Sequence, residues 1–188
     1  MHATLRSLLN RRRLTLALGA AATLGLLTLG SHLQAEECPT FRPGPEHEIL
    51  AAFRGTYELA FSDGAKGGST CQSGLGGQWL LEEVRADFCG KPYEGRGATS
   101  YDPARKKYVN VWIDSVSPVP FVSEGTYDAA TRTLTFAGEM TLPGGATTRA
   151  TLTIVRTDAD SRTFRLEVSG PSGAPTELFH ITYRRRAD

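Results

Sequence analysis

Three aspartates, Asp102, Asp128 and Asp158, each open a short polar loop that has a basic residue four positions later and a β-rich run after it. An aspartate at the first position of a turn can accept a hydrogen bond from the backbone N–H two residues on, so each loop is expected to reverse an extended strand. Consecutive hairpins form a meander, and a long meander commonly closes into a barrel. The loops therefore predict an antiparallel up-and-down architecture.

Ten runs rich in β-branched and aromatic residues are the expected strands. They cover residues 56–61, 69–75, 79–88, 93–101, 107–114, 121–127, 133–140, 147–156, 163–169 and 177–184. A short helix is expected before them, because Pro45 suits the first helical position and Gly55 suits the C-terminal stop. The predicted fold class is all-β, an antiparallel up-and-down β-barrel of about ten strands whose lead-in helix plugs one mouth.

The first 35 residues have the composition of a secretory signal peptide. Arg6 and residues 11–13 form a positive region, residues 14–29 an uncharged apolar run of 16 residues, and Ala35 a small residue at the expected cleavage position. The apolar run is shorter than the roughly 20 residues that a spanning helix needs. We therefore expect residues 1–35 to be cleaved, leaving 36–188 as one domain in the periplasm or outside the cell without a stable membrane anchor. The pattern leaves open whether export is by the Sec or the twin-arginine route.

The chain after residue 35 is nearly balanced in charge. Four of the 21 basic residues and none of the 20 acidic ones lie in the signal, which leaves 17 basic against 20 acidic residues. A nucleic-acid-binding domain usually carries a clear excess of positive charge, so nucleic acid is not an expected partner. The remaining 153 residues are enough for one hydrophobic core.

All three cysteines, Cys38, Cys71 and Cys89, follow the signal, and export would permit disulfides. If residues 74–77 turn between two strands, Cys89 lies about a dozen residues beyond the turn, too far along its strand to reach Cys71. A bridge from Cys38 to one of the other two is therefore favoured. Without a Cys-x-x-Cys pair the cysteines do not indicate a metal site, and no cofactor is expected.

Residues 107–114 alternate between two faces. Tyr108, Asn110, Trp112 and Asp114 share one face, and three aliphatic residues share the other. A face that mixes aromatic and polar groups suits a ligand cavity if it points inward. The alternative is that Trp112 only fills the barrel and that Asp114 ends the strand with a backbone hydrogen bond. The candidate ligand-binding residues are Asn110, Trp112, Asp114 and Tyr127, with Tyr101 and Arg149 as further wall positions.

Three other side chains each leave two roles open. Arg149 alternates with apolar residues, so it is either an internal partner of Asp114 or Glu83 or an exposed arginine on the outer face. His180 on the last expected strand is either a haem ligand, as in related barrels, or a surface histidine. His47 lies in the expected helix, where packing or capping at the barrel mouth is favoured over acid–base catalysis. No nucleophile elbow, phosphate loop or His-Glu-x-x-His motif occurs in the sequence.

A series of motifs resembles, in order along the chain, those of one known family. They are Gly44-Pro45-Glu46-His47, Phe53-Arg54-Gly55-Thr56-Tyr57, Gly76-Gly77-Gln78-Trp79-Leu80, Tyr101-Asp102-Pro103, Trp112-Ile113-Asp114, Gly125-Thr126-Tyr127-Asp128 and Ile181-Thr182-Tyr183-Arg184. The family is the bacterial domain-of-unknown-function family number fifteen seventy-nine, which belongs with the lipocalin-like, or calycin, barrels. The resemblance implies a calycin barrel over nearly the whole mature chain, and it implies no activity because the family has no established function.

The expected architecture and its aromatic interior favour a non-catalytic barrel that binds a small apolar or amphipathic molecule. A barrel that binds another envelope protein is the second hypothesis, supported by the apolar loop Pro118-Val119-Pro120-Phe121. A calycin-type isomerase is the third, and it would require a paired acid and base at the cavity. Asp114 is the one candidate for such a group.

Overall fold

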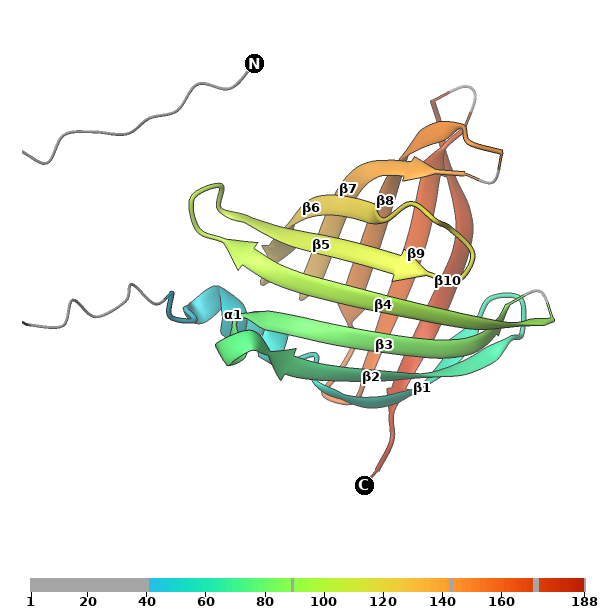
Figure 1. The fold of residues 1–188 in the computed structure, drawn as a ribbon. Helices are drawn as coiled ribbons and strands as arrows, with labels where there is room; N and C mark the ends of the chain where they lie inside the picture. The colour runs from blue at the N-terminus through green and yellow to red at the C-terminus, as the bar shows by residue number, and fades with distance from the viewer. Residues whose placement is uncertain (1–40, 89, 143, 171–172, 188) are drawn as a thin grey trace, which may run out of the picture. The chain divides into compact units, whose positions relative to one another are not determined.

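The structure is a computed structural model that describes residues 41–88, 90–142, 144–170 and 173–187. Within them, ten antiparallel strands form a closed barrel: each strand pairs with its neighbours in the sequence, and the last pairs with the first (Figure 1). The predicted all-β up-and-down barrel with one lead-in helix is confirmed. The expected signal peptide, Cys38 and Cys89 lie outside the described residues.

Each predicted strand overlaps one observed strand. The strands are β1 (Gly55–Phe61), β2 (Lys66–Gly74), β3 (Trp79–Phe88), β4 (Lys91–Asp102), β5 (Lys107–Asp114), β6 (Phe121–Asp128), β7 (Thr133–Thr141), β8 (Thr147–Arg156), β9 (Ser161–Ser169) and β10 (Pro175–Arg185). A helix, α1 (Pro45–Ala51), precedes β1, and a 3-10 turn, η1 (Leu75–Gly77), joins β2 to β3. Among the described residues, no helix combines the length and the apolar character that crossing a bilayer requires.

The three predicted turn aspartates each accept a hydrogen bond from the backbone N–H two residues on. The distances are 2.9 Å from Ala104 to Asp102, 2.9 Å from Ala130 to Asp128 and 2.8 Å from Asp160 to Asp158. The basic residues that follow them differ. Lys106 and Arg132 are exposed turn residues with φ of 54°, whereas Arg162 belongs to β9 and is buried. The aspartate-to-basic spacing that the three loops share therefore predicts the turns, but it does not predict whether the basic side chain is exposed or buried.

Period-two alternation places one face of each strand in the lumen. On β1, for example, Tyr57 is buried and Glu58 is exposed. Large and small side chains alternate around this interior: a Cβ added to Gly95 or Gly97 of β4 would come within 2.3 Å or 2.8 Å of the Trp112 indole. The two glycines therefore leave the space against β4 that the indole of β5 occupies.

Helix α1 lies at one end of the barrel (Figure 1). Leu50 and Phe53 are buried there and reach the interior cavity described below. His47 is also buried, and its Nδ1 accepts a hydrogen bond from the Gly44 N–H at 3.0 Å. The Tyr108 hydroxyl of β5 donates to the Glu46 carbonyl at 3.2 Å. The expected capping role of His47 and the plugging role of the helix are thus both seen in its contacts.

The opposite end holds four phenylalanines, which we call the aromatic cluster: Phe61, Phe88, Phe164 and Phe179. It lies away from α1 because β1 starts beside the helix at Gly55 and ends at Phe61. The ring of Phe179 lies 6.3 Å from Phe61, 6.5 Å from Phe88 and 5.9 Å from Phe164 between centroids. All four side chains are half-buried, so solvent reaches this end of the lumen.

Candidate functional site: the barrel interior

A cavity of about 50 Å³ lies inside the barrel next to α1. Its apolar wall comes from the α1 segment and from β3, β7, β8 and β9, through Leu50, Phe53, Leu80, Leu134, Phe136, Leu152, Ile154 and Phe164. The rest of the lining comprises Glu82, Thr99, Asn110, Trp112, Arg162 and Tyr183. This space holds a few water molecules. A drug-sized ligand needs roughly 300–1,000 Å³ and would have to displace part of the wall.

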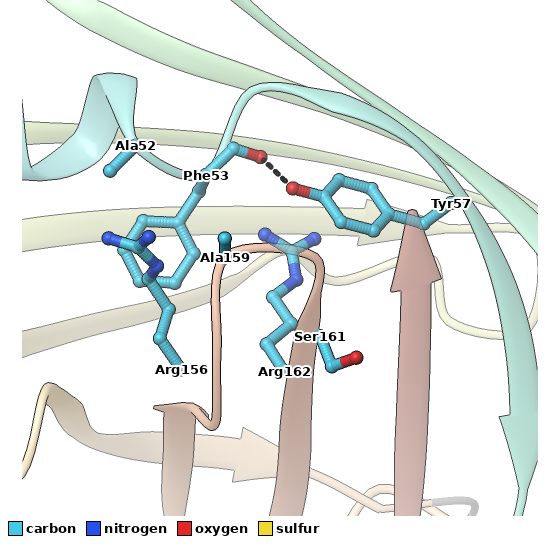
Figure 2. Close-up of a pocket in the computed structure, with 7 residues that line it drawn as sticks. All are labelled: Ala52, Phe53, Tyr57, Arg156, Ala159, Ser161 and Arg162. Atoms are coloured by element: carbon cyan, nitrogen blue, oxygen red, sulfur yellow. Dashed lines mark hydrogen bonds between the residues drawn. The ribbon is translucent and has the colours of Figure 1, made fainter. Parts of the chain in front are cut away.

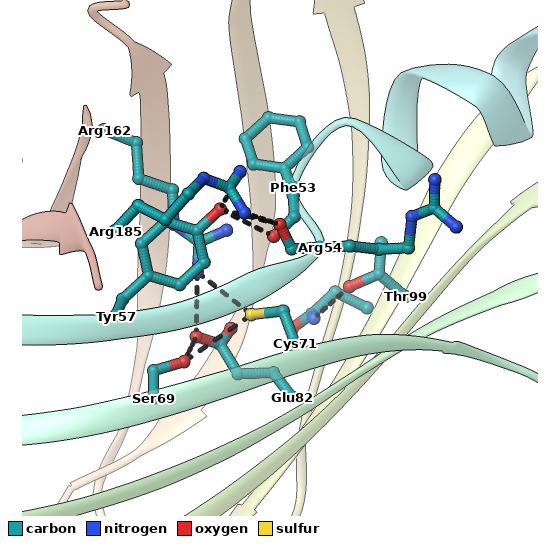
Figure 3. A network of polar contacts seen from close by, with 10 residues as sticks. Phe53, Arg54, Tyr57, Ser69, Cys71, Glu82, Thr99, Arg162 and Arg185 are labelled. Atoms are coloured by element: carbon teal, nitrogen blue, oxygen red, sulfur yellow. Dashed lines mark hydrogen bonds and ion pairs between the residues drawn. The ribbon is translucent and has the colours of Figure 1, made fainter. Parts of the chain in front are cut away.

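The polar part of this lining is built around Arg162, a residue that is 5% exposed (Figure 3). Its Nη2 donates to Glu82 Oε1 at 3.0 Å and to Cys71 Sγ at 3.2 Å. The Ser69 hydroxyl donates to the same Glu82 oxygen at 2.6 Å. We call Arg162, Glu82, Cys71 and Ser69 the buried polar cluster. Its opposite charges are paired and hydrogen-bonded, which is the condition under which charges persist inside a protein.

Aromatic rings hold the Arg162 guanidinium in place. Its central carbon lies 4.2 Å from the ring centroid of Tyr183, 4.6 Å from that of Tyr57 and 5.5 Å from that of Phe53. The Tyr57 ring is itself fixed, because its hydroxyl donates to the Phe53 carbonyl at 3.0 Å and accepts from Arg185 Nη2 at 3.0 Å. Cation–π contacts strengthen when they are desolvated, so these rings stabilise the cation in one orientation.

Burial and pairing set the protonation states of the cluster. Burial lowers the pKa of the Arg162 guanidinium, but Glu82 and Cys71 raise it by more, so the side chain stays charged. Burial raises the pKa of the Cys71 thiol to about 12, with Glu82 adding to the rise and Arg162 opposing it. The thiol is therefore protonated at neutral pH, whereas a nucleophile or a metal ligand has to be the thiolate.

A second hollow of about 10 Å³ lies on the other side of Arg162 (Figure 2). Its lining comes from the segment after α1, from β1 and from the β8–β9 hairpin: Ala52, Phe53, Tyr57, Arg156, Ala159, Ser161 and Arg162. Phe53 and Arg162 line both hollows and so form the partition between them. Arg156 flanks the Phe53 ring, with its guanidinium carbon 5.8 Å from the centroid. The hollow holds about one water molecule and is too small to be a ligand site by itself.

Asn110 gives the cavity an unpaired polar group. Its Nδ2 donates to Thr99 Oγ1 at 2.8 Å, while its Oδ1 is buried without a hydrogen-bond partner among the described residues. Exchanging the amide oxygen and nitrogen would leave the nitrogen unpaired instead. An unsatisfied buried polar group costs roughly 1–3 kcal/mol. Oδ1 itself has almost no accessible surface, so a water molecule or a ligand atom reaches it only after a small shift of the side chain.

Asn110 and Trp112 line the cavity, so the predicted inward direction of their strand face agrees with the structure. Asp114 shares that face but does not line the described cavity. Its Oδ2 accepts from Trp112 Nε1 at 3.1 Å, and its Oδ1 accepts from the backbone N–H groups of Val116 and Ser117, both at 2.9 Å. These contacts end β5 and orient the indole, which is the alternative role weighed for this carboxylate.

The other predicted wall residues lie away from the cavity. Tyr101 packs at the α1 end, with its ring centroid 5.1 Å from Tyr108 and 6.3 Å from His47. Tyr127 is half-buried and packs against the hydrophobic core. Neither side chain belongs to the wall of the described cavity.

Of the two roles left open for Arg149, its position in the structure fits the exposed one on the outer face. Arg149 is exposed and pairs in register with Glu139 of β7, because alternation on β8 directs its neighbour Ala150 into the lumen. An internal pair with Glu83 is also ruled out by position. Glu83 is exposed and meets Arg96 on the outer face, with the nearest N and O atoms 3.6 Å apart.

The sequence patterns considered above do not single out Arg162 or Glu82. The sequence nevertheless contained a signal, because each of these charged residues shares its strand face with apolar neighbours. Leu80 and Val84 flank Glu82. Phe164 and Leu166 follow Arg162 on the same face. A charge on an apolar face must be paired or hydrogen-bonded. Two such faces of opposite charge would have indicated the internal ion pair.

His180 is exposed, and its Nδ1 lies 2.6 Å from Glu177 Oε1, so the surface role fits its position and the haem alternative does not. Cys71 is a free, buried cysteine. The bridge from Cys38 to one of the other two cysteines stays a prediction, since Cys38 and Cys89 lie outside the described residues. Among the residues that the structure describes, no three His, Cys, Asp or Glu side chains are grouped so that they could hold a metal ion.

The comparisons with known proteins identify a family. The model of the family described as "Protein of unknown function (DUF1579)" matches residues 42–185. No curated protein matches the chain. A solved structure described as a "De novo design of a fluorescence-activating beta barrel" is similar at 19% identity and a TM-score of 0.41, over 73% of this chain and 97% of that chain. The family match spans helix α1 and all ten strands, and the chain therefore belongs to the DUF1579 family.

Proposed function

We propose that this protein binds a small apolar or amphipathic molecule inside its barrel. The observation that carries the proposal is the unpaired amide of Asn110, buried at an interior cavity. The cavity has the composition of a binding site, since most of its lining is apolar or aromatic and a few polar groups converge on it. Three buried side-chain atoms lack a partner among the described residues, His47 Nε2, Asn110 Oδ1 and Ser123 Oγ, and Asn110 is the one of the three residues that lines the cavity.

The volume of the cavity limits what can bind without movement. About 50 Å³ accepts a head group or a very small molecule, so a longer ligand must extend past the wall. Phe164 belongs both to the cavity wall and to the aromatic cluster, where it stacks on Phe179. Half-buried rings move at lower cost than the buried plug residues Leu50 and Phe53, so the ligand is proposed to reach the cavity from the end with the aromatic cluster.

Trp112 is the reporter for this proposal, because its indole lines the cavity. The chain has two tryptophans, so Trp79→Phe leaves Trp112 as the sole indole. Fatty acids, retinoids, haem and short-chain alcohols are the probes. Binding should quench or shift Trp112 emission, and Trp112→Phe should abolish the response while Trp79→Phe preserves it. The proposal is contradicted if no probe changes the emission and Asn110→Leu raises the unfolding free energy.

The expected place of action is the periplasm or the outside of the cell, after cleavage behind Ala35. The support is the sequence of residues 1–35 alone. The intact mass of the exported protein should equal that of a chain that begins at Glu36. Retention of the apolar segment in washed membranes would contradict this part of the proposal.

The outer face offers a second candidate, binding of another envelope protein. The apolar residues Ile113, Val116, Val119 and Val122 of β5, β6 and the loop between them are 52%, 60%, 46% and 50% exposed. Exposed apolar patches often mark interaction sites. Ile113→Lys should then weaken association with the envelope partner and leave probe binding at Trp112 unchanged. Equal association of the variant and the original protein would remove the support for this candidate.

A further inference from the structure

We infer that the head group of the ligand is uncharged and that Glu82 is the residue that excludes an anionic one. The inference rests on the proposed function and concerns the same cavity. A cavity with a buried arginine in its wall would by itself suit a carboxylate, because the guanidinium binds carboxylates through two parallel hydrogen bonds. The surroundings of Arg162 argue against that assignment.

The charges at the cavity cancel. Of the fourteen described residues that line it, Glu82 and Arg162 are the two charged ones, and they form an ion pair of 3.0 Å. A bound anion would lie beside the Glu82 carboxylate in a site shielded from water, where like charges repel much more strongly than in solvent. A bound cation would meet the Arg162 guanidinium in the same way. A neutral head group avoids both costs.

The hydrogen bonds left open specify a head group that both donates and accepts. Both hydrogen bonds of the guanidinium use Nη2, while Nε and Nη1 donate to no acceptor among the described residues. Arg162 can therefore donate to a ligand oxygen. Asn110 Oδ1 has no hydrogen-bond partner among the described residues, and a small shift of its side chain would let it accept from a ligand O–H or N–H. A hydroxyl or a carboxamide supplies both functions without a charge.

The two anchors are already fixed before a ligand arrives. Arg162 packs against both the Tyr57 and the Tyr183 rings, and Asn110 is hydrogen-bonded to Thr99. A preorganised site loses little conformational entropy on binding, so its preference depends mainly on the match of charge and hydrogen bonds. The head group is therefore the part of the ligand on which this cavity discriminates most sharply.

A set of probes with one chain and different head groups tests the inference: hexan-1-ol, hexanamide, hexanoate and hexylammonium, titrated against Trp112 emission in the Trp79→Phe protein. The alcohol and the amide should bind at least about tenfold more tightly than either ion. If hexanoate or hexylammonium binds as tightly as the neutral probes, the inference is overturned and the proposed function stands. If none of the four changes the emission, the inference and the proposed function both lose their support.

Glu82→Gln then tests the selecting residue, because it preserves the shape of the side chain and removes its charge. The affinity for hexanoate should rise about tenfold or more, so that hexanoate becomes the tightest-binding probe, since Arg162 has lost its counter-ion. Glu83→Gln is the matched control on the outer face of the same strand and should leave the ranking unchanged. A folded Glu82→Gln protein in which hexanoate gains nothing overturns the role of Glu82. If that variant does not fold, the order of affinities for the four probes in the protein with Glu82 intact tests the inference by itself.

Discussion

The two ends of the barrel are closed by different kinds of interaction. At the α1 end, the buried polar cluster joins β2, β3 and β9 through an ion pair and directional hydrogen bonds (Figure 3). At the other end, the aromatic cluster joins β1, β3, β9 and β10 through ring contacts that solvent reaches. Loss of Arg162 or Glu82 leaves an unpaired charge in the first case, and loss of one ring leaves a partly wet gap in the second. We therefore expect the α1 end to set stability and the aromatic end to admit the ligand.

The turns at the two ends differ in part. The aspartate-led turns at Asp102, Asp128 and Asp158 lie at the α1 end, where side-chain hydrogen bonds fix their backbones. The turns at the opposite end contain glycines in the left-handed region, with φ of 89° at Gly64, 72° at Gly90, 95° at Gly144 and 79° at Gly173. The separation is partial, because left-handed Gly76 and Gly77 also form the η1 turn at the α1 end, and Asp63 accepts a hydrogen bond from the Ala65 N–H at 2.9 Å at the opposite end.

Arg162→Met should have the largest effect on stability. It leaves the Glu82 carboxylate at the cavity without its counter-ion, and breaking a buried pair in this way typically costs about 3–5 kcal/mol. Urea unfolding measures the loss. The double variant Arg162→Met with Glu82→Leu is the control and should lose less than the single variant, because no charge is then stranded. A cost below about 1 kcal/mol for the single variant would contradict the assigned role of this end.

Truncating one ring at each end compares the two ends directly. Phe53→Ala at the α1 end should cost about 3–5 kcal/mol, as expected for a fully buried aromatic side chain. Phe179→Ala should cost clearly less, because its ring is half-buried, and it should speed the binding of hexan-1-ol. Urea midpoints and stopped-flow Trp112 emission measure these effects. Equal losses of unfolding free energy in the two variants, or slower hexan-1-ol binding in Phe179→Ala, would show that the α1 end does not set stability and that the aromatic end does not admit the ligand.

The thiol of Cys71 reports on opening of the α1 end. In a background with Cys38→Ser and Cys89→Ser, a thiol reagent should label Cys71 much more slowly in the folded than in the unfolded protein, because the thiol is buried and burial raises its pKa to about 12. The folded state binds the proton more tightly, so its stability is fully present below pH 9 and declines as the pH rises toward 12. Labelling equally fast in both states would mean that this end opens freely.

The turn aspartates should have the smallest effect, confined to acid pH. The pKa of each carboxyl is lowered, chiefly by the Arg105 side chain at Asp102, the Thr131 hydroxyl at Asp128 and the Asp160 N–H at Asp158. The unfolded state therefore binds protons more readily, and stability falls as the pH drops from 3.8 through the lower folded values. The melting temperature reports this loss of stability. Asp128→Asn should make its decrease at acid pH shallower, whereas Asp87→Asn on β3 should leave the decrease unchanged. Identical acid profiles would show that the turn bonds contribute nothing.

The strands and turns could be predicted from the sequence because both depend on near neighbours. Alternation in residues 107–114 directs Asn110 and Trp112 inward, and the turn bond of Asp128 spans two residues. The buried ion pair could not be found in the same way, because Arg162 and Glu82 are 80 positions apart and meet only when the barrel closes. The alternation along one strand indicates that a charged side chain faces inward. Which charged side chains form a pair depends on how the strands are arranged in the closed barrel.

Arg149 and Arg162 illustrate how fine this distinction is. Both arginines lie on strands with apolar residues, and a one-residue difference in phase separates the outer face from the lumen. Arg149 precedes the fully buried Ala150 and therefore points outward, whereas Arg162 is two residues from Phe164 and points inward. The spacing from Asp158 suggests a turn residue like Lys106, and the tertiary structure overrides that resemblance.

Native mass spectrometry of the protein isolated without denaturation tests most directly whether the barrel holds a ligand. We expect the folded protein to carry a small organic molecule beyond the mass of the chain, to release it as a neutral species on activation, and to carry less of it in the Asn110→Leu variant. A folded protein whose mass is that of the polypeptide alone in every preparation would contradict the proposal and leave the interior as a packed core with a few water molecules.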